Sequence, residues 1–278
     1  MKLVISASRR TDIPAFYMDW MINAVRTGSV DVQNPFYKNS TYRVDLKPER
    51  VEWIVFWSRN YSNFLKHRNY FEAYKLFFHF TILSPHRYLE KNHLSSNRAI
   101  QQMERLVYLY GADHIIWRYD PIVTWLSGTK IETNFVESDF KQLCEIFTGM
   151  GIRRCYFSFV TPYKKFIRRF SRLFPDLKLI FTNKEYTDLI STQMSEIAEL
   201  YDMQLFSCCN DHIISGKIQK GSCISGTLLN KLSGKKIVSE AKSPGRPQCG
   251  CSRALDIGSY TDQPCYYGCV YCYANPVI

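Results

Sequence analysis

The chain has 278 residues, of which 46% are hydrophobic and 22% charged, which is ordinary for a globular protein with a buried core and excludes a low-complexity chain. Its formal net charge of +11 favours anionic partners such as nucleic acid, nucleotides or small molecules with phosphate or carboxylate groups. The first residues, MKLVISASRRTDIP, hold too short an apolar run for a secretory signal, and no stretch approaches the roughly 20 apolar residues that span a bilayer. We therefore expect a cytoplasmic protein without membrane attachment, in which ten cysteines indicate metal or redox chemistry.

Short apolar runs rich in β-branched and aromatic residues predict strands along the first 210 residues. These runs cover 3–6, 51–57, 76–83, 114–119, 154–160 and 203–207, with 177–182 as a candidate additional strand. Apolar residues at helical spacing predict helices near 100–110, 140–147 and 190–201. Apolar strands separated by helices favour a parallel sheet with both faces covered. We expect an α/β fold, namely a full or partial TIM-like (β/α) barrel, with a doubly wound open sheet as the main rival.

The composition changes after about residue 210, where glycine, serine, lysine and cysteine dominate. Apolar periodicity is poor there, apart from a short helix expected near 226–232. We therefore divide the chain into a barrel over residues 1–210 and a loop-rich, cysteine-rich segment over residues 211–278 that packs over the barrel mouth. A metal centre would supply the energy that orders such a segment.

Polar side chains collect where the predicted strands end, which is where ligands lie in barrels and open parallel sheets. The candidate catalytic residues there are Arg9, Asp12, Arg59, Arg118 and Asp120, and the candidate cofactor-binding residues are Ser8, Arg10 and Asn60. Three guanidinium groups at one mouth would be costly unless they met carboxylates or an anionic ligand. The pattern favours an anion site, with structural ion pairs as the alternative.

Other features have plainer interpretations. The basic run KKFIRRFSR at 164–172 is consistent with a helix that tracks a phosphate backbone, but a solvated helix face is the favoured interpretation. His79 in an apolar strand is interpreted as a core residue with satisfied hydrogen bonds, and Cys144 and Cys155 as small core residues.

The other eight cysteines all follow residue 207, which is not a core pattern. Cys265, Cys269 and Cys272 form a C-x3-C-x2-C motif among tyrosines. Three thiolates at this close spacing can hold three irons of a [4Fe–4S] cluster and leave the fourth iron open for a ligand. Tyr267 and Tyr273 would shield the cluster and supply hydroxyl groups, so we add them to the candidate cofactor-binding residues.

A second set of four ligands is possible in the same segment. It combines Cys249 and Cys251 with Cys223 and one residue of the adjacent pair Cys208 and Cys209. Such a set would hold a second [4Fe–4S] cluster or a zinc ion. Spacing does not separate the adjacent pair; we choose Cys209 because it lies further from the predicted strand.

The run CYYGCVYCYAN resembles the cluster loop of radical S-adenosylmethionine enzymes. The resemblance implies a β/α barrel in which the open iron binds the amino and carboxylate groups of S-adenosylmethionine. It also implies that one electron, delivered by a donor such as flavodoxin or ferredoxin, cleaves this cofactor to a 5′-deoxyadenosyl radical. In that superfamily the loop usually follows the first strand, whereas here it lies in the last residues, and WSRNY stands where a Gly-Gly-Glu motif is usual.

The whole chain resembles domain-of-unknown-function family 1848, an uncharacterised prokaryotic family, in SASRRTDIPAF, FWSRN, WRYDP and CGCSRALDIGSY followed by CYYGCVYCYAN. That resemblance implies the cluster but no reaction. We expect a radical S-adenosylmethionine-type enzyme that acts on an anionic substrate such as a nucleotide or nucleic acid. Two alternatives stay open: a non-radical enzyme whose open iron acts as a Lewis acid or binds substrate sulfur, and a basic nucleic-acid-binding protein stapled by zinc. The substrate and the oligomeric state are not predicted.

Overall fold

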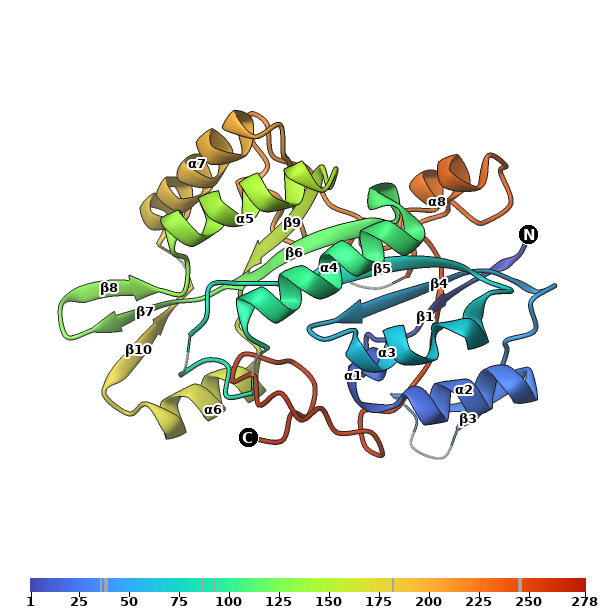
Figure 1. The fold of residues 1–278 in the computed structure, drawn as a ribbon. Coiled ribbons are helices and arrows are strands. Elements are labelled where there is room, and N and C mark those ends of the chain that lie inside the picture. Colours follow the sequence, from blue (N-terminus) through green and yellow to red (C-terminus); the bar gives the residue numbers. More distant parts are fainter. Residues whose placement is uncertain (36, 38–39, 87, 93, 182, 245–246) are drawn as a thin grey trace.

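The computed structural model describes residues 1–278 except 36, 38–39, 87, 93, 182 and 245–246. Within the described residues, eight strands form one parallel sheet in the spatial order β12-β11-β9-β6-β5-β4-β1-β13 (Figure 1). Their bounds are β1 (Leu3–Ser6), β4 (Val51–Ser58), β5 (Lys75–Thr81), β6 (Ile115–Ile122), β9 (Arg154–Phe159), β11 (Gln204–Ser207), β12 (Gln219–Lys220) and β13 (Leu255–Asp256). The six main strand predictions are confirmed to within a few residues at each end.

The strands from β1 to β12 occupy successive places in the sheet in the order in which the chain makes them. A doubly wound sheet reverses its direction of winding after a few strands, and this part of the sheet does not. Each crossover therefore carries the chain one place further in the same direction, and β13 returns to pair with the free side of β1.

Helices cover one face of the sheet, with α3, α4 and α5 lying across it in Figure 1. The helix bounds are α1 (Ile13–Phe16), α2 (Met18–Thr27), α3 (Ser62–His67), α4 (Ser96–Tyr110), α5 (Glu137–Gly149), α6 (Lys164–Leu173), α7 (Lys184–Leu200) and α8 (Gly226–Ser233), with single 3₁₀ turns at Arg68–Phe71, Ala112–His114 and Asp211–Ile213. Because side chains alternate along a strand, Ile54 and Phe56 join the core under these helices, together with Met103 of α4. None of the described helices is long and apolar enough to cross a bilayer.

The other face of the sheet is covered by the segment that follows residue 210. Trp53 and Val55 of β4 point to this side, where they pack with Leu229 of α8 and with Cys251. The segment also supplies strands β12 and β13 to the sheet. It is therefore built into the main sheet rather than resting on it through side chains alone.

Two small antiparallel sheets complete the fold. Strand β10 (Leu177–Ile180) pairs with β7 (Thr124–Ser127), which also pairs with β8 (Lys130–Thr133). The candidate strand at 177–182 is thus a strand, but it belongs to this small sheet, and residue 182 lies outside the described residues. The hairpin of β2 (Ser29–Gln33) and β3 (Thr41–Asp45) is a further element that the sequence did not predict.

Candidate functional site

The cysteines Cys265, Cys269 and Cys272, here called the loop thiols, lie in a loop that packs against α1, α6 and the stretch after β5 (Figure 1). Main-chain hydrogen bonds hold this loop: Val270 donates to the carbonyl of Leu89 at 2.9 Å. Cys269 is 7% exposed, and the other two thiols are partly buried. The structure therefore brings the C-x3-C-x2-C motif to the residues that follow β1 and β5, at the carboxyl ends of the strands.

Burial raises the pKa of all three loop thiols, that of Cys265 to about 12. The negative charge of Asp12 adds to this effect at Cys265, whereas Arg59 opposes it at Cys269. The three sulfur atoms also interact electrostatically with one another. Because thiols bind metals as thiolates, a cation at this position would supply the positive charge that their ionisation needs.

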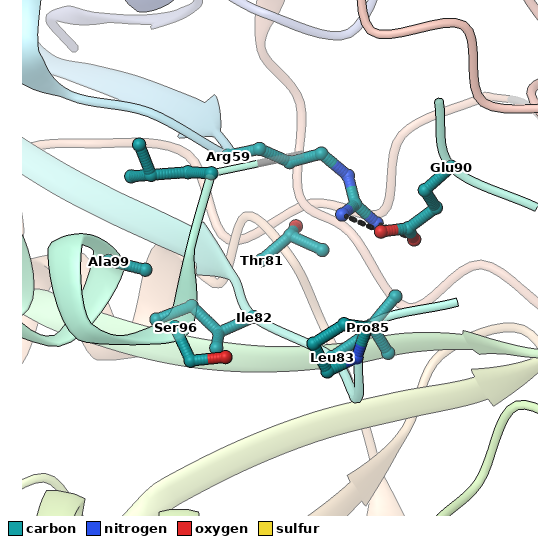
Figure 2. Close-up of a pocket in the computed structure, with 9 residues that line it drawn as sticks. Arg59, Thr81, Ile82, Leu83, Pro85, Glu90, Ser96 and Ala99 are labelled. Atoms are coloured by element: carbon teal, nitrogen blue, oxygen red, sulfur yellow. Dashed lines mark hydrogen bonds and ion pairs between the residues drawn. The ribbon is translucent and has the colours of Figure 1, made fainter. Parts of the chain in front are cut away.

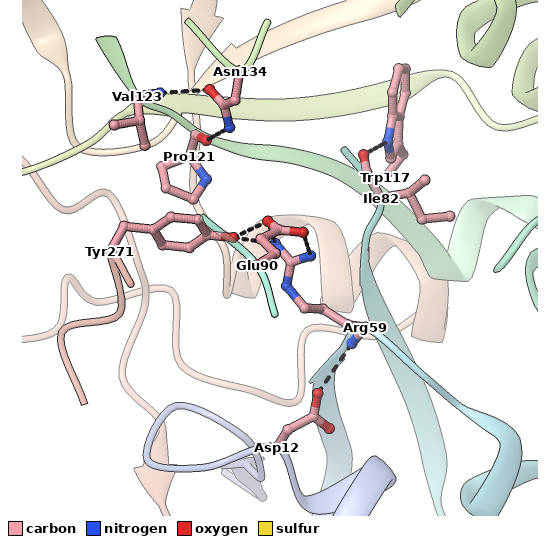
Figure 3. A network of polar contacts seen from close by, with 9 residues as sticks. All are labelled: Asp12, Arg59, Ile82, Glu90, Trp117, Pro121, Val123, Asn134 and Tyr271. Carbon is pink, nitrogen blue, oxygen red and sulfur yellow. Dashed lines mark hydrogen bonds and ion pairs between the residues drawn. The ribbon is translucent and has the colours of Figure 1, made fainter. Parts of the chain in front are cut away.

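Arg59 lies at the centre of an ionic network beside these thiols (Figure 3). Its guanidinium donates two hydrogen bonds to the carboxylate of Glu90, at 2.8 and 2.6 Å, and one to the hydroxyl of Tyr271 at 2.5 Å. Tyr271 in turn donates to Glu90. Since Tyr271 stands between Cys269 and Cys272 in the chain, this network fixes the middle of the motif. Arg59 was predicted to be a site residue, but Glu90 was not.

A small pocket borders the same ion pair (Figure 2). Its lining combines Arg59 and Glu90 with apolar residues at the end of β5 and the start of α4, namely Ile82, Leu83, Pro85, Leu94 and Ala99, and with the hydroxyls of Thr81 and Ser96. The ion pair therefore lies between this pocket and the motif loop.

Asp12 is the second buried charge near the loop thiols. Its carboxylate caps α1 by accepting from the backbone N–H of Ala15 at 3.1 Å, and it also accepts from the hydroxyl of Ser58 at 2.7 Å and the N–H of Arg59 at 3.1 Å. Burial raises the pKa of Asp12 to about 7, although these hydrogen bonds oppose the shift. The network is therefore positioned between the ends of β1 and β4, as the sequence predicted.

Several buried hydroxyls near this place have no hydrogen-bond partner among the described residues, namely those of Ser6, Ser8, Thr11 and Tyr267. Tyr267 is 7% exposed and interacts electrostatically with Asp12, Cys265 and Cys269. A buried hydroxyl without a partner costs about 1–3 kcal/mol, so such a group is a candidate for a hydrogen bond to water or to a bound molecule. This observation makes the loop thiols a fitting place for a cofactor.

The remaining predicted cofactor-binding residues are held by the protein itself. Arg10 donates to the carbonyls of Gln33 and Gly258, at 2.7 and 3.2 Å, and to the hydroxyl of Tyr42. The amide of Asn60 accepts from the N–H of Ser62 at 2.9 Å and from the side chain of Gln102 at 2.9 Å. The hydroxyl of Tyr273 donates to the carbonyl of Arg9. These three side chains shape the surroundings of the motif.

Five further cysteines converge on the sheet face opposite the helices, and we call them the inner-face thiols: Cys208, Cys209, Cys223, Cys249 and Cys251. The sulfur atoms of Cys208 and Cys223 are 3.3 Å apart. The other thiols are close enough to influence one another's ionisation: Cys251 acts on the pKa of Cys223, Cys249 on that of Cys251, and Cys209 on that of Cys249. All four members of the predicted second set are thus brought together, with Cys208 as a fifth.

Within the described residues, no group of three or more Cys, His, Asp or Glu side chains is arranged to hold a metal ion as it stands. A metal bound at either thiol group would therefore require these side chains to rearrange. Among the inner-face thiols, the sulfur atoms of Cys208 and Cys223 are already in contact.

Arg118 is the cation beside the inner-face thiols. Its guanidinium donates to the sulfur of Cys223 at 3.0 Å and pairs with Asp120, which also accepts from the hydroxyl of Ser158. The pKa of Cys223 lies well below its usual value, because the thiols of Cys208 and Cys251 donate hydrogen bonds to it and Arg118 favours its thiolate. The predicted pair of Arg118 and Asp120 is therefore an ion pair that also contacts sulfur.

His79 and Arg9 border the same group. Burial lowers the pKa of His79 to about 3, and its Nε2 lies 2.7 Å from the carbonyl of Cys223 while its Nδ1 has no partner among the described residues. The interpretation of His79 as a fully satisfied core residue is thus wrong for one of its ring nitrogens. The guanidinium of Arg9 is 3.4 Å from the carboxylate of Asp256 and 5.6 Å from the ring centre of Trp57.

The basic helix α6 has a role that the sequence did not predict. Arg169 donates to the carbonyls of Val270 and Cys272, and Lys165 donates to the side chain of Asn275 at 2.8 Å. One edge of α6 therefore holds the motif loop, so the helix face is not simply solvated.

Comparison with known proteins gives one match. The family model described as "Domain of unknown function (DUF1848)" matches residues 4–274. No curated protein and no solved structure matches the chain. The match spans the main sheet, both thiol groups and the ionic network beside the loop thiols, and the chain accordingly belongs to the DUF1848 family.

Proposed function

We propose that this protein is an iron–sulfur enzyme of the radical S-adenosylmethionine type, with a [4Fe–4S] cluster bound by Cys265, Cys269 and Cys272. The observation that carries the proposal is the burial of three mutually interacting thiols in one loop beside the unpartnered hydroxyl of Tyr267. Three thiolates leave one iron without a protein ligand. This open coordination position distinguishes the cluster of a radical enzyme from a structural cluster, in which the protein binds all four irons.

The fold supports this proposal. Parallel strands that follow one another in chain order are the arrangement of a full or partial (β/α) barrel, which is the architecture we propose for residues 1–210. The segment 211–278 would then be the iron–sulfur-binding part, lying over the carboxyl ends where barrel enzymes bind their substrates.

When bound and reduced by a donor such as flavodoxin or ferredoxin, the cluster would supply one electron for the cleavage of S-adenosylmethionine. The residues of this chain would orient that molecule and exclude water. Ser8 and Tyr267 have free hydroxyls to offer, whereas Arg10 and Asn60 are engaged within the protein. Asp12, with a pKa of about 7, would hold or release a proton near neutral pH.

The proposed substrate is anionic, such as a nucleotide or a nucleic acid, in keeping with the net charge of +11. Arg118 is held closely by Asp120 and Cys223, whereas Arg9 pairs with Asp256 only at 3.4 Å, so Arg9 is the cation better placed to receive an anionic group. The side chain of Arg9 is 27% exposed, and its contact with Trp57 offers a flat apolar surface beside a positive charge.

One experiment tests the proposal. The protein is purified and reconstituted with iron and sulfide without oxygen, then incubated with dithionite and S-adenosylmethionine. We expect broad absorption near about 400 nm and formation of 5′-deoxyadenosine. Cys269→Ala should abolish the product, whereas Cys144→Ala, which removes a buried thiol from α5, should retain it.

The outcomes separate the alternatives. Product formation that survives in Cys269→Ala would contradict the assignment of the loop thiols. A loaded cluster that never yields 5′-deoxyadenosine would favour the non-radical enzyme. Colourless protein that takes up zinc but no iron would favour the zinc-stapled nucleic-acid-binding protein, whose affinity should fall steeply with salt.

A further inference from the structure

We infer that the inner-face thiols form a second metal centre, a closed one with four thiolate ligands from Cys209, Cys223, Cys249 and Cys251. This centre is independent of the loop thiols and of the proposed radical chemistry. It would hold either a zinc ion or an iron–sulfur cluster, since both are bound by four thiolates.

The first support is the way in which distant parts of the chain deliver their sulfur atoms to one place. The thiols come from the end of β11, from residue 223 and from residues 249–251, and they lie close enough to influence one another's pKa. Four thiolates around one tetrahedral zinc ion are separated by about 3.8 Å, as follows from bonds of about 2.3 Å. The sulfur of the neighbouring thiol Cys208 lies 3.3 Å from that of Cys223, so sulfur atoms are already packed at this distance around one of the four proposed ligands.

The second support is that N–H groups point at sulfur. Arg118 donates to the sulfur of Cys223 at 3.0 Å, and the backbone N–H of Ile224 donates to the sulfur of Cys251 at 3.5 Å. Such donors stabilise thiolates rather than neutral thiols, and they are typical of the groups that surround bound metals. Hydrogen-bond donors that would stabilise metal-bound thiolates are therefore already in place at two of the inner-face thiols.

The third support is charge balance. Four thiolates with a doubly charged ion or cluster carry a net charge of about −2. The guanidinium of Arg118 touches this group, and that of Arg9 interacts electrostatically with Cys223 and Cys251. The positive charges of these two guanidinium groups would thus balance the negative charge of the centre, on a face of the sheet that is otherwise apolar.

The fourth support is the close packing of Gly250 between Cys249 and Cys251. A Cβ atom at Gly250 would lie 2.6 Å from the hydroxyl oxygen of Ser222 and 3.0 Å from the carbonyl oxygen of Gly221. Only glycine lets this stretch approach the one that carries Cys223. The Cys-Gly-Cys spacing is therefore what allows both flanking thiols to reach the group.

Backbone conformation selects the ligand from the adjacent pair. Cys209 has a φ of 59°, in the left-handed region that non-glycine residues rarely adopt. Its thiol is close enough to Cys249 to lower the pKa of that residue. Cys208 faces the inner side of the sheet simply by continuing the alternation of β11. We therefore assign Cys209 as the fourth ligand and Cys208 as a neighbouring thiol.

The test uses a background variant of the full chain that lacks the loop thiols, Cys265→Ala/Cys269→Ala/Cys272→Ala. After anaerobic reconstitution with zinc in one sample and with iron and sulfide in another, we expect about one zinc or about four irons per chain. Absorption distinguishes the two, because only the iron–sulfur form is coloured. Adding Cys223→Ala/Cys251→Ala should lower the metal content at least about tenfold, whereas adding Cys144→Ala should not.

Two single changes on the same background test the assignment of the fourth ligand. Cys209→Ser should lose the metal, and Cys208→Ser should keep it. The reverse result would overturn that assignment, and a folded background variant without stoichiometric metal would overturn the centre itself. Because the loop thiols are absent, either result leaves the proposed radical chemistry untouched.

A labelling measurement covers the case in which the variants with additional cysteine changes on this background do not fold. In the metal-loaded background variant, the inner-face thiols should resist alkylation and become reactive after a chelator is added, as read by mass spectrometry of peptides. Thiols that alkylate equally with and without the chelator would overturn the inference. Protection that a reductant alone removes would do so as well, because it would indicate a disulfide.

Discussion

The loop thiols and the inner-face thiols differ in what contacts their sulfur atoms. The three loop thiols are neighbours in the chain, and the nearest buried cation, Arg59, is occupied by Glu90 and Tyr271. The inner-face thiols come from three stretches of the chain, and Arg118 donates directly to one of them. A set of three ligands leaves a coordination position for another molecule, whereas a set of four closes the site. On the proposals made above, the loop thiols would form a reactive centre and the inner-face thiols a structural one.

The largest expected effect comes from breaking the network at the loop thiols. Arg59→Met would leave Glu90 buried without its cation, and we expect the free energy of unfolding to fall by about 3–5 kcal/mol. Iron at the loop thiols should be lost, while metal at the inner-face thiols stays. Urea denaturation and metal analysis measure both effects.

The double variant Arg59→Met/Glu90→Leu is the matched control for that change. Since it removes both charges together, it should be more stable than Arg59→Met alone. If instead the two variants were equally unstable, the guanidinium would be stabilising the loop through contacts other than Glu90. Equal loss of metal from both thiol groups in Arg59→Met would remove the distinction between them.

A smaller effect is expected from the helix that holds the motif loop. Arg169→Ala removes the donors to the carbonyls of Val270 and Cys272, and we expect the free energy of unfolding to fall by about 1–3 kcal/mol. Iron should dissociate faster from the loop thiols alone. Arg168, on the exposed side of the same helix, provides the control, because Arg168→Ala removes the same charge without this contact. Equal iron release from both variants would show that only net charge matters.

The smallest effect is expected at the opposite end of β4, where Glu52 pairs with Lys75 at 2.5 Å and Lys2 at 3.4 Å. Burial raises the pKa of Glu52, but these ion pairs outweigh it and leave the pKa below its ordinary value. This stabilisation is therefore present above the pKa of the unfolded chain and is lost as the pH falls through the lowered value. Glu52→Gln should cost about 0.5–1 kcal/mol near pH 7 and progressively less below about pH 4.

Urea denaturation at several pH values measures the loss of unfolding free energy in Glu52→Gln. Metal analysis of the same variant measures whether metal is retained. Glu52→Gln should leave the metal content of both thiol groups intact, which would show that a loss of stability does not by itself release metal. A cost that grew as the pH fell would contradict the ion-pair explanation.

Much of the main sheet could be predicted from the sequence, because its strands are buried on both faces and read as continuous apolar runs. The run VEWIVFW became β4, and LFFHFTIL became β5. The hairpin of β2 and β3 escaped prediction because its residues are mostly only partly buried and include exposed charged ones such as Asp31 and Arg43. Its stability depends on pairing that no local pattern reveals.

The candidate site was predictable to the extent that its ligands are close in the chain. Cys265, Cys269 and Cys272 were found because they lie within eight residues of one another. Glu90 and Arg169 were not found, because only the folded chain brings them to Tyr271 and Cys272. The part played by Cys208 likewise depends on a sulfur contact that spacing does not encode.

The order of the strands has a consequence for biosynthesis. Every cysteine of both thiol groups follows residue 207, so the strands from β1 to β11 leave the ribosome before any of them. At that moment the inner face, with Trp53, Phe77 and Tyr156, has no covering layer. Newly made chains therefore pass through a stage in which an apolar face of the sheet is not yet covered by the C-terminal segment, and the proposed metal centres would be filled only after that stage.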